Sequence, residues 1–355
     1  MGSEGRRLIC VVGATGNQGG SVARRFLAAG FRVRGLTRNS TSPAAIELAS
    51  QGAELIEANL DDPSSLDQAF AGANVIFSVT DYWEPFFHPQ SRKAAEAQGI
   101  SYRRFAYDTE YRHGKNIADA AAKVAGSLDA NGFLVSTLSH AGKCSGGKFK
   151  ELYHFDSKAD IFPAYVEEHY PELAAKMSCI QTGFFYTSFN ILPHSYFGRS
   201  TLCSNTMFKL PDGRIEMAFA TDSTKTVPHF APVDDMGPFT YAVWQMPPGK
   251  HYMAAGTNCT WPEFIKTWSK VSGVPATYRQ ISPEEMIKAA GEPQLGAEAT
   301  DMFLYSSQPG YDGGMDVLQA EDIRKAGIDC PMTTWEEWAK RQDWDAVLAR
   351  LHGTA

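Results

Sequence analysis

Long apolar runs are missing from this chain. No stretch of about 18 consecutive apolar residues is present to span a bilayer, and the first residues lack the apolar core of a secretory signal peptide. Cysteine is sparse as well, because the six cysteines are scattered along the sequence without a C-x-x-C pair. These absences predict a soluble protein of the cytoplasm whose thiols are reduced.

Concentrated positive charge and metal-ligand patterns are also missing. The formal net charge is -7, and no run of Lys or Arg is long enough to follow a phosphate backbone. The nine histidines show neither an H-E-x-x-H pattern nor carboxylate pairing at metal-ligand spacing. No G-x-S-x-G segment marks a nucleophile elbow. The sequence therefore argues against direct nucleic-acid binding, a metal centre and a serine nucleophile.

A glycine-rich segment near the N-terminus carries the most information. Residues 11–22 read V-V-G-A-T-G-N-Q-G-G-S-V and follow an apolar strand pattern. Gly13 permits a sharp turn, Gly16 lets backbone amides approach a pyrophosphate, and Gly19 lets a following helix pack closely on the sheet. The phosphates are expected at the positive end of the helix that begins near Gln18. The contacts predicted for a dinucleotide are Gly13, Thr15, Gly16, Asn17, Gln18 and Gly19.

Strand patterns alternate with amphipathic helical patterns through the first half, which indicates a parallel sheet with crossover helices. The expected strands are Leu8–Val12, Arg32–Leu36, Glu54–Glu57, Val75–Val79, Phe133–Ser136 and Ser178–Thr182. The expected helices are Gln18–Ala29, Pro43–Gln51, Pro63–Phe70, Asn116–Ser127 and Asp156–His169. The pattern predicts an α/β protein with a Rossmann-type, doubly wound parallel sheet over residues 1–183. The looser, aromatic-rich remainder predicts a smaller α/β domain for substrate or partner over residues 184–355, from which some segments can return to the first domain.

The loops beyond the carboxyl ends of the strands are the expected ligand-binding region. Arg38 follows the second strand, where an acidic residue would bind the ribose of NAD(H) and an arginine accommodates a 2′-phosphate. NADP(H) is therefore the favoured cofactor, and a solvated surface arginine is the alternative. Asn59 follows the third strand, where an adenine edge would rest, and Thr80 begins the loop after the fourth strand, which would face the nicotinamide or cover the pocket.

Four motifs resemble the NmrA-like family, an atypical branch of the short-chain dehydrogenases/reductases. They are G-A-T-G-N-Q-G-G at 13–20, T-D-Y-W at 80–83, H-G-K-N-I-A-D-A-A at 113–121 and H-F-D-S-K at 154–158. A weaker G-Y-D-G-G at 310–314 extends the resemblance over nearly the whole chain, and T-D-Y-W is similar to fungal members. The resemblance implies a Rossmann domain that binds NADP(H) or NAD(H). The family includes redox sensors that bind a transcriptional regulator as well as reductases, many of which belong to fungal secondary metabolism.

The wider superfamily uses Tyr-x-x-x-Lys, because residues four apart share one helix face and the lysine can bind the nicotinamide ribose and lower the pKa of the tyrosine. Lys158 takes the lysine position, but His154 stands where the tyrosine is expected, and Tyr153 is one residue out of register. This departure argues against ordinary carbonyl reduction. Two interpretations of His154 stay open: a general acid near neutral pH, or a helix cap in a site that binds cofactor without chemistry.

Aromatic residues follow the fourth and sixth strands. The rings of segment 80–88 suit a bulky aromatic or apolar ligand, although the same rings can pack on the second domain. Tyr186 follows the sixth strand and is an alternative proton donor if its side chain points inward. Ser139 follows the fifth strand, near the place of the superfamily's substrate-orienting serine.

Two functions follow from these residues. The first is an NADP(H)-dependent oxidoreductase that transfers hydride to an imine, iminium or conjugated carbon of a bulky natural-product intermediate, with cyclisation through transient redox as a variant. Its catalytic residues are Lys158, His154 and Tyr186. The second is a non-catalytic redox sensor that binds NAD(P)(H) and a protein partner, for which a nuclear location is also expected. Arg38 and the aromatic loops favour the enzyme, and iminium reduction needs no strong acid.

Overall fold

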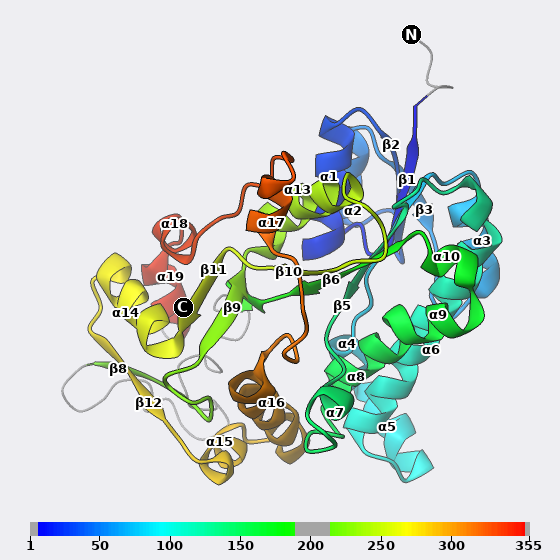
Figure 1. Ribbon diagram of the computed structural model, residues 1–355. Helices are drawn as coiled ribbons and strands as arrows, with labels where there is room; N and C mark the ends of the chain where they lie inside the picture. The colour runs from blue at the N-terminus through cyan, green and yellow to red at the C-terminus, as the bar shows by residue number, and fades with distance from the viewer. Residues whose placement is uncertain (1–5, 189–213, 352–355) are drawn as a thin grey trace.

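A seven-stranded parallel sheet forms the centre of the fold (Figure 1). The computed structural model describes residues 6–188 and 214–351. Its strand order, β10-β6-β5-β4-β1-β2-β3, reverses direction beside β1, as in doubly wound folds. The strands are β1 (Leu8–Val11), β2 (Arg32–Thr37), β3 (Glu54–Glu57), β4 (Val75–Ser78), β5 (Phe133–Thr137), β6 (Met177–Thr182) and β10 (His251–Ala254). The Rossmann-type α/β fold expected from the sequence is confirmed.

Helices cover both faces of this sheet. Ile9 and Val11 of β1 pack in one core with α1 and α13, whereas Leu8 and Cys10 pack in the opposite core with α3 and α6, because successive side chains of a strand point to opposite faces. The helices of this part are α1 (Asn17–Ala28), α2 (Pro43–Ser50), α3 (Pro63–Phe70), α4 (Trp83–Phe87), α5 (Pro89–Gln98), α6 (Tyr102–Lys123), α7 (Ala141–Cys144), α8 (Tyr153–Ala159), α9 (Val166–His169), α10 (Pro171–Ala174) and α13 (Pro232–Trp244).

The later residues build a second apolar core around Trp261, Trp268 and Trp335. Two small sheets, β11-β9-β7 and β12-β8, contribute to it. Their strands are β7 (Phe184–Phe185), β8 (Ile215–Phe219), β9 (Thr226–Phe230), β11 (Thr257–Thr260) and β12 (Ala276–Gln280). The helices are α14 (Trp261–Ser272), α15 (Pro283–Ala289), α16 (Pro293–Tyr305), α17 (Ala320–Lys325), α18 (Trp335–Lys340) and α19 (Trp344–Leu351). Both β10 and α13 return to the first sheet, and a domain boundary at residue 183 stays a prediction.

Two expected helices differ from the structure. Helix α6 begins at Tyr102 rather than Asn116, because the Ser101 side chain caps it by accepting from the amide of Arg104 at 3.0 Å. The single helix expected over residues 156–169 is interrupted, because Phe162 has non-helical backbone angles and Pro163 has no amide hydrogen to donate. Helix α8 therefore ends at Ala159, and α9 is a separate turn.

Three features are absent from residues 6–188 and 214–351. No helix in these ranges is long and apolar enough to cross a membrane. They contain no group of three or more His, Cys, Asp or Glu side chains that could bind a metal ion. Cys203 lies outside the described residues, and the other five cysteines form no disulfide.

Candidate active site

The glycine turn leaves the N-terminus of α1 open. Gly13 has a φ of +64°, which favours glycine, and a Cβ on Gly19 would lie 2.3 Å from the carbonyl oxygen of Gly13. The helix is N-capped by Gly16 without any side-chain hydrogen bond, and its first turn holds no acidic residue. Amides at a helix N-terminus without a side-chain cap bind anions well. The turn therefore fits the diphosphate of a dinucleotide.

The polar side chains of this turn face neighbouring strands. Gln18 accepts a hydrogen bond from the hydroxyl of Ser136 at the end of β5, at 2.8 Å. The hydroxyls of Thr15 and Thr37 lie 3.5 Å apart, which joins the turn to the end of β2. Asn17 is exposed. The structure thus places these three residues beside the open end of α1, and their contacts with a cofactor stay predictions.

Arg38 and Asn59 lie in the loops after β2 and β3. The Arg38 side chain is 74% exposed and lies 3.4 Å from a carboxylate oxygen of Glu84. Because an exposed ion pair contributes little free energy, the guanidinium can leave Glu84 and bind a phosphate. The Asn59 side-chain oxygen accepts from the amide of Asp61 at 3.0 Å. Because this bond stabilises its own turn, the structure gives Asn59 a local role, and its adenine contact stays a prediction.

Lys158 lies in a buried polar cluster. Glu110 of α6, whose carboxylate has no solvent exposure, accepts hydrogen bonds from Lys158 and Ser157 and from the Thr80 hydroxyl, the last at 2.7 Å. Thr80 follows β4, so this cluster brings Lys158 to the carboxyl edge of the sheet. Two predicted site residues are therefore brought together. Sequence reasoning missed Glu110, because its helix was expected to begin only at Asn116.

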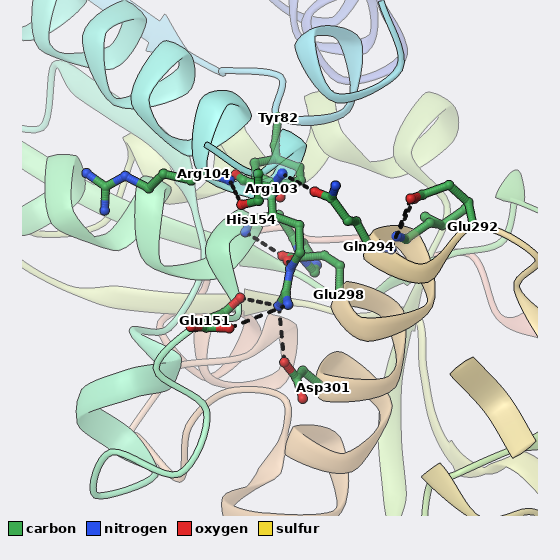
Figure 2. Close-up of polar contacts among 11 residues, drawn as sticks. Tyr82, Arg103, Arg104, Glu151, His154, Glu292, Gln294, Glu298 and Asp301 are labelled. Carbon is green, nitrogen blue, oxygen red and sulfur yellow. Dashed lines mark hydrogen bonds and ion pairs between the residues drawn. The ribbon is translucent and has the colours of Figure 1, made fainter. Parts of the chain in front are cut away.

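His154 lies in a second buried cluster, which Figure 2 shows. Its Nδ1 lies 2.6 Å from Oε1 of Glu298 on α16, and its backbone amide donates to the same oxygen at 2.9 Å. The other carboxylate oxygen of Glu298 accepts from Nε of Arg103 at 2.6 Å. Arg103 also donates to Asp301 at 3.1 Å. His154 is therefore bound through its side chain to the second core, and no local pattern in the sequence signals that partner.

Aromatic rings surround His154. The ring centroid of Trp83 lies 5.0 Å from that of His154, and Tyr82 lies at 5.7 Å. Tyr82 is buried and donates its hydroxyl to the carbonyl of Arg103 at 3.2 Å, and burial raises the pKa of this hydroxyl. Phe87, stacked on Trp83, is 43% exposed. The loop after β4 thus borders His154 with rings that extend to the surface.

His140 forms a third charged cluster. Its Nδ1 lies 3.0 Å from Asp156, and its Nε2 lies 3.1 Å from Asp160. Burial disfavours the charged imidazole, but the hydrogen bonds to both carboxylates outweigh it and raise the pKa of His140 to about 9. Asp160 also accepts from the Tyr107 hydroxyl at 2.7 Å. The cluster ties the start of α7 to the end of α8.

The structure separates Tyr186 from the Lys158 and His154 clusters. Tyr186 is fully buried in the second core, where its ring packs on Trp335 and Trp338 and its hydroxyl donates to the carbonyl of Thr333 at 3.4 Å. The Tyr186 hydroxyl therefore does not have the orientation toward these clusters that a proton donor requires. The reason is that β7, which precedes Tyr186, pairs with β9 and leads the chain into the second core. Ser139 is likewise enclosed, 2.8 Å from the Tyr305 hydroxyl.

The fold and the open glycine turn define a Rossmann-type protein with a dinucleotide-type site and a His-x-x-x-Lys pair. The sequence model of the NmrA-like family matches residues 5–339, and the chain belongs to that family. The chain is similar to the NmrA-like family domain-containing oxidoreductase ptmS of Penicillium ochrochloron, with 26% identity covering 86% of this chain and 85% of that protein. It is 42% identical to the oxidoreductase hkm9 of Aspergillus hancockii, over 33% of this chain and 30% of that protein.

A solved structure shares the whole architecture. The structure of NmrA, a negative transcriptional regulator, in complex with NADP has a TM-score of 0.66, with 18% identity over 97% of this chain and 98% of that chain. At this identity the likeness shows the fold alone. The comparisons thus include proteins named oxidoreductases and a protein named a regulator.

Proposed function

We propose that the protein is an NADP(H)-dependent oxidoreductase that delivers hydride to an imine, iminium or conjugated carbon of a bulky natural-product intermediate. The observation that carries the proposal is the pair His154 and Lys158 on α8, each bonded to a fully buried carboxylate. Ligands of such sheets bind beyond the carboxyl ends of the strands, and buried carboxylates that hold a histidine and a lysine in fixed positions there suit a catalytic site. Family relatives named oxidoreductases, one of which aligns over most of its length, support it.

Each polar group has a distinct task. The amides at the start of α1 bind the diphosphate, and Arg38 binds the 2′-phosphate. Lys158, positioned by Glu110, donates to the hydroxyls of the nicotinamide ribose. When bound, the nicotinamide supplies the hydride. The rings of Trp83 and Phe87 exclude water and pack against a flat substrate.

His154 donates the proton that some of these reductions require. Reduction of an iminium consumes a hydride alone, because the cationic carbon accepts the electron pair and the positive charge disappears. Reduction of a neutral imine or of a conjugated carbonyl also consumes one proton, which the His154 imidazolium donates. A cyclisation with transient reduction would return the hydride to the oxidised cofactor, so product forms without net loss of NADPH.

Cofactor titration tests the proposal first. We expect NADPH to bind more tightly than NADH, and Arg38→Ala to remove about 10- to 100-fold of that preference, as expected for a charge-assisted hydrogen bond. Arg341→Ala is the control, because Arg341 is a half-exposed arginine that pairs with Asp234 in another part of the fold. Equal affinity for all four oxidised and reduced nicotinamides would argue against the reductase.

Turnover is measured next, as NADPH consumption with a panel of cyclic imines and enones. We expect His154→Gln to slow enone reduction by about 10²-fold or more, with a smaller effect on iminium reduction. Lys158→Met is expected to weaken NADPH binding. Unchanged turnover in both variants would remove the proposed site.

A redox sensor is the second candidate function. The absence of a tyrosine four residues before Lys158 favours it. A sensor requires that the oxidised and reduced cofactor change the affinity for a protein partner by different factors. Partner binding that is independent of the cofactor would contradict this candidate.

A further inference from the structure

The buried carboxylate of Glu298 is bonded to His154 and Arg103, and in addition to burial it also raises the pKa of the neighbouring Tyr82 hydroxyl. Its carboxylate has no solvent exposure, and the His154 side chain is 6% exposed. One oxygen faces the backbone amide and Nδ1 of His154, and the other faces Nε of Arg103 (Figure 2). The amide and the guanidinium are obligatory donors. Among the contacts that His154 and Arg103 make with Glu298, only the one with Nδ1 therefore depends on whether the nitrogen carries a proton.

The short distance between Nδ1 of His154 and the Glu298 carboxylate determines whether Nδ1 carries a proton. Nδ1 lies 2.6 Å from a carboxylate oxygen, and an unprotonated nitrogen at this distance would place two lone pairs against each other. Glu298 also remains ionised: burial raises its pKa, but the bonds from His154 and the charge of Arg103 outweigh burial and lower it. A carboxylate next to one ring nitrogen of a histidine selects the tautomer in which that nitrogen carries the proton.

We propose that Glu298 is a positioning residue that fixes neutral His154 as the Nδ1–H tautomer, so that His154 exchanges protons with substrate only at Nε2. The proposal rests on the proposed function of His154. The imidazolium loses its Nε2 proton to the substrate, and the N–H electron pair stays on Nε2. The product is the tautomer that Glu298 already stabilises, so no ring rotation or second proton transfer is needed.

Glu298 and His154 come from distant parts of the chain. Glu298 lies 144 residues after His154 in sequence, on helix α16, which belongs to the second core. The packing of α16 against α6 and α8 therefore determines the tautomer of the His154 ring, which lies on the side of the seven-stranded sheet. Because the His154 ring is bordered by Trp83 and Tyr82, an atom that receives the proton lies among aromatic rings, which suits an unsaturated substrate.

The test is nitrogen NMR of ¹⁵N-histidine-labelled full-length protein, at a pH where the rings are neutral. The His154 signals are identified by their loss in His154→Gln. We expect a protonated Nδ1 and an unprotonated Nε2 in the wild type. In Glu298→Gln, the amide offers one acceptor and one donor to three donors, so we expect the fraction of the Nδ1–H form to fall at least twofold, whereas Glu298→Asp retains it in part.

Asp301→Asn is the matched control. Asp301 lies on the same helix and bonds the same arginine, but no contact joins it to His154, so we expect the tautomer to be unchanged. An Nε2–H tautomer in the wild type would overturn the proposal even if Glu298→Gln does not fold, as would an unchanged tautomer in a folded Glu298→Gln. Neither result depends on turnover. A confirmed tautomer with full activity in His154→Gln would instead contradict the proposed function alone.

Discussion

Lys158 of α8 and Glu110 of α6 form an ion pair in which the carboxylate has no solvent exposure and the lysine side chain is 15% exposed. Four residues earlier on α8, His154 has the same kind of partner in Glu298 of α16. Helix α8 therefore carries its two candidate functional side chains between two other helices, each of which supplies one buried carboxylate. The position of both groups depends on tertiary packing as much as on α8 itself.

Breaking the first pair is expected to cost more than breaking a surface pair. Lys158→Met leaves the Glu110 carboxylate buried without a cation, and we expect a loss of about 3 kcal/mol in the free energy of unfolding. Lys123→Met is the control, because Lys123 is 60% exposed and pairs with Asp67 at the surface, where the cost is below about 1 kcal/mol. Urea denaturation measures both.

A double-mutant cycle separates the pair from other effects. We expect Glu110→Gln added to Lys158→Met to recover part of the lost stability, because the uncompensated charge is removed, with a coupling energy of about 1–3 kcal/mol. Strictly additive free energies would show that the two side chains do not interact in solution.

The glycine turn gives the second prediction. In Gly19→Ala the new methyl would lie 2.3 Å from the Gly13 carbonyl oxygen, so α1 must move away from β1. We expect a loss of about 1–3 kcal/mol in stability together with weaker NADPH binding. Gly126→Ala is the control, because the nearest atom to its Cβ would be 3.9 Å away. Equal melting temperatures and NADPH affinities for the two variants would contradict the close packing of α1.

The third prediction concerns pH. The groups that face His140 are Asp156, Asp160 and, through Asp160, Lys143 and Tyr107. Because the pKa of His140 rises from its ordinary value of 6.5 to about 9 on folding, its contribution to stability is fully present below about pH 6.5 and is lost as the pH rises through about 9.

His140→Gln isolates this contribution. We expect the difference in unfolding free energy between wild type and variant to be on the order of 2 kcal/mol larger at pH 6 than at pH 9.5. His88→Gln is a control for the general effect of pH, because His88 is exposed and caps α5. A difference that does not vary with pH would mean that His140 is not charged in the folded protein.

Local sequence patterns predicted the helices, strands and turns whose structure is determined by residues close to them in the sequence. The first six strands of the central sheet, the turn at Gly13–Gly19 and α1 follow from apolar runs, glycine positions and helical periodicity, whereas β10 was not predicted. The start of α6 had a local signal as well, since Ser101 stands three residues before the amide that it caps. Glu298 had none, because an acidic residue on an amphipathic helix is usually solvated. The direction of Tyr186 was left open by the sequence, because it depends on the pairing of β7 with β9, which joins residues far apart in the chain.

The last prediction compares two adjacent arginines on α6. Arg103 donates to Glu298 at 2.6 Å and to Asp301 at 3.1 Å, with a side chain 9% exposed. Arg104, the next residue, is 49% exposed and pairs with Asp108 one turn away. We expect Arg103→Met to cost about 3–5 kcal/mol, because Glu298 then loses its cation inside the protein. Arg104→Met should cost below about 1 kcal/mol.

The same comparison tests how α16 is attached. Because Arg103 joins α6 to α16, Arg103→Met should also increase hydrogen exchange of the α16 amides, whereas Arg104→Met should leave them unchanged. If the two variants unfolded at the same urea concentration, the buried cluster would contribute no more than a surface pair. Glu298 would then keep its place through the packing of α16 alone, and its bond to His154 would be a result of that packing rather than of charge.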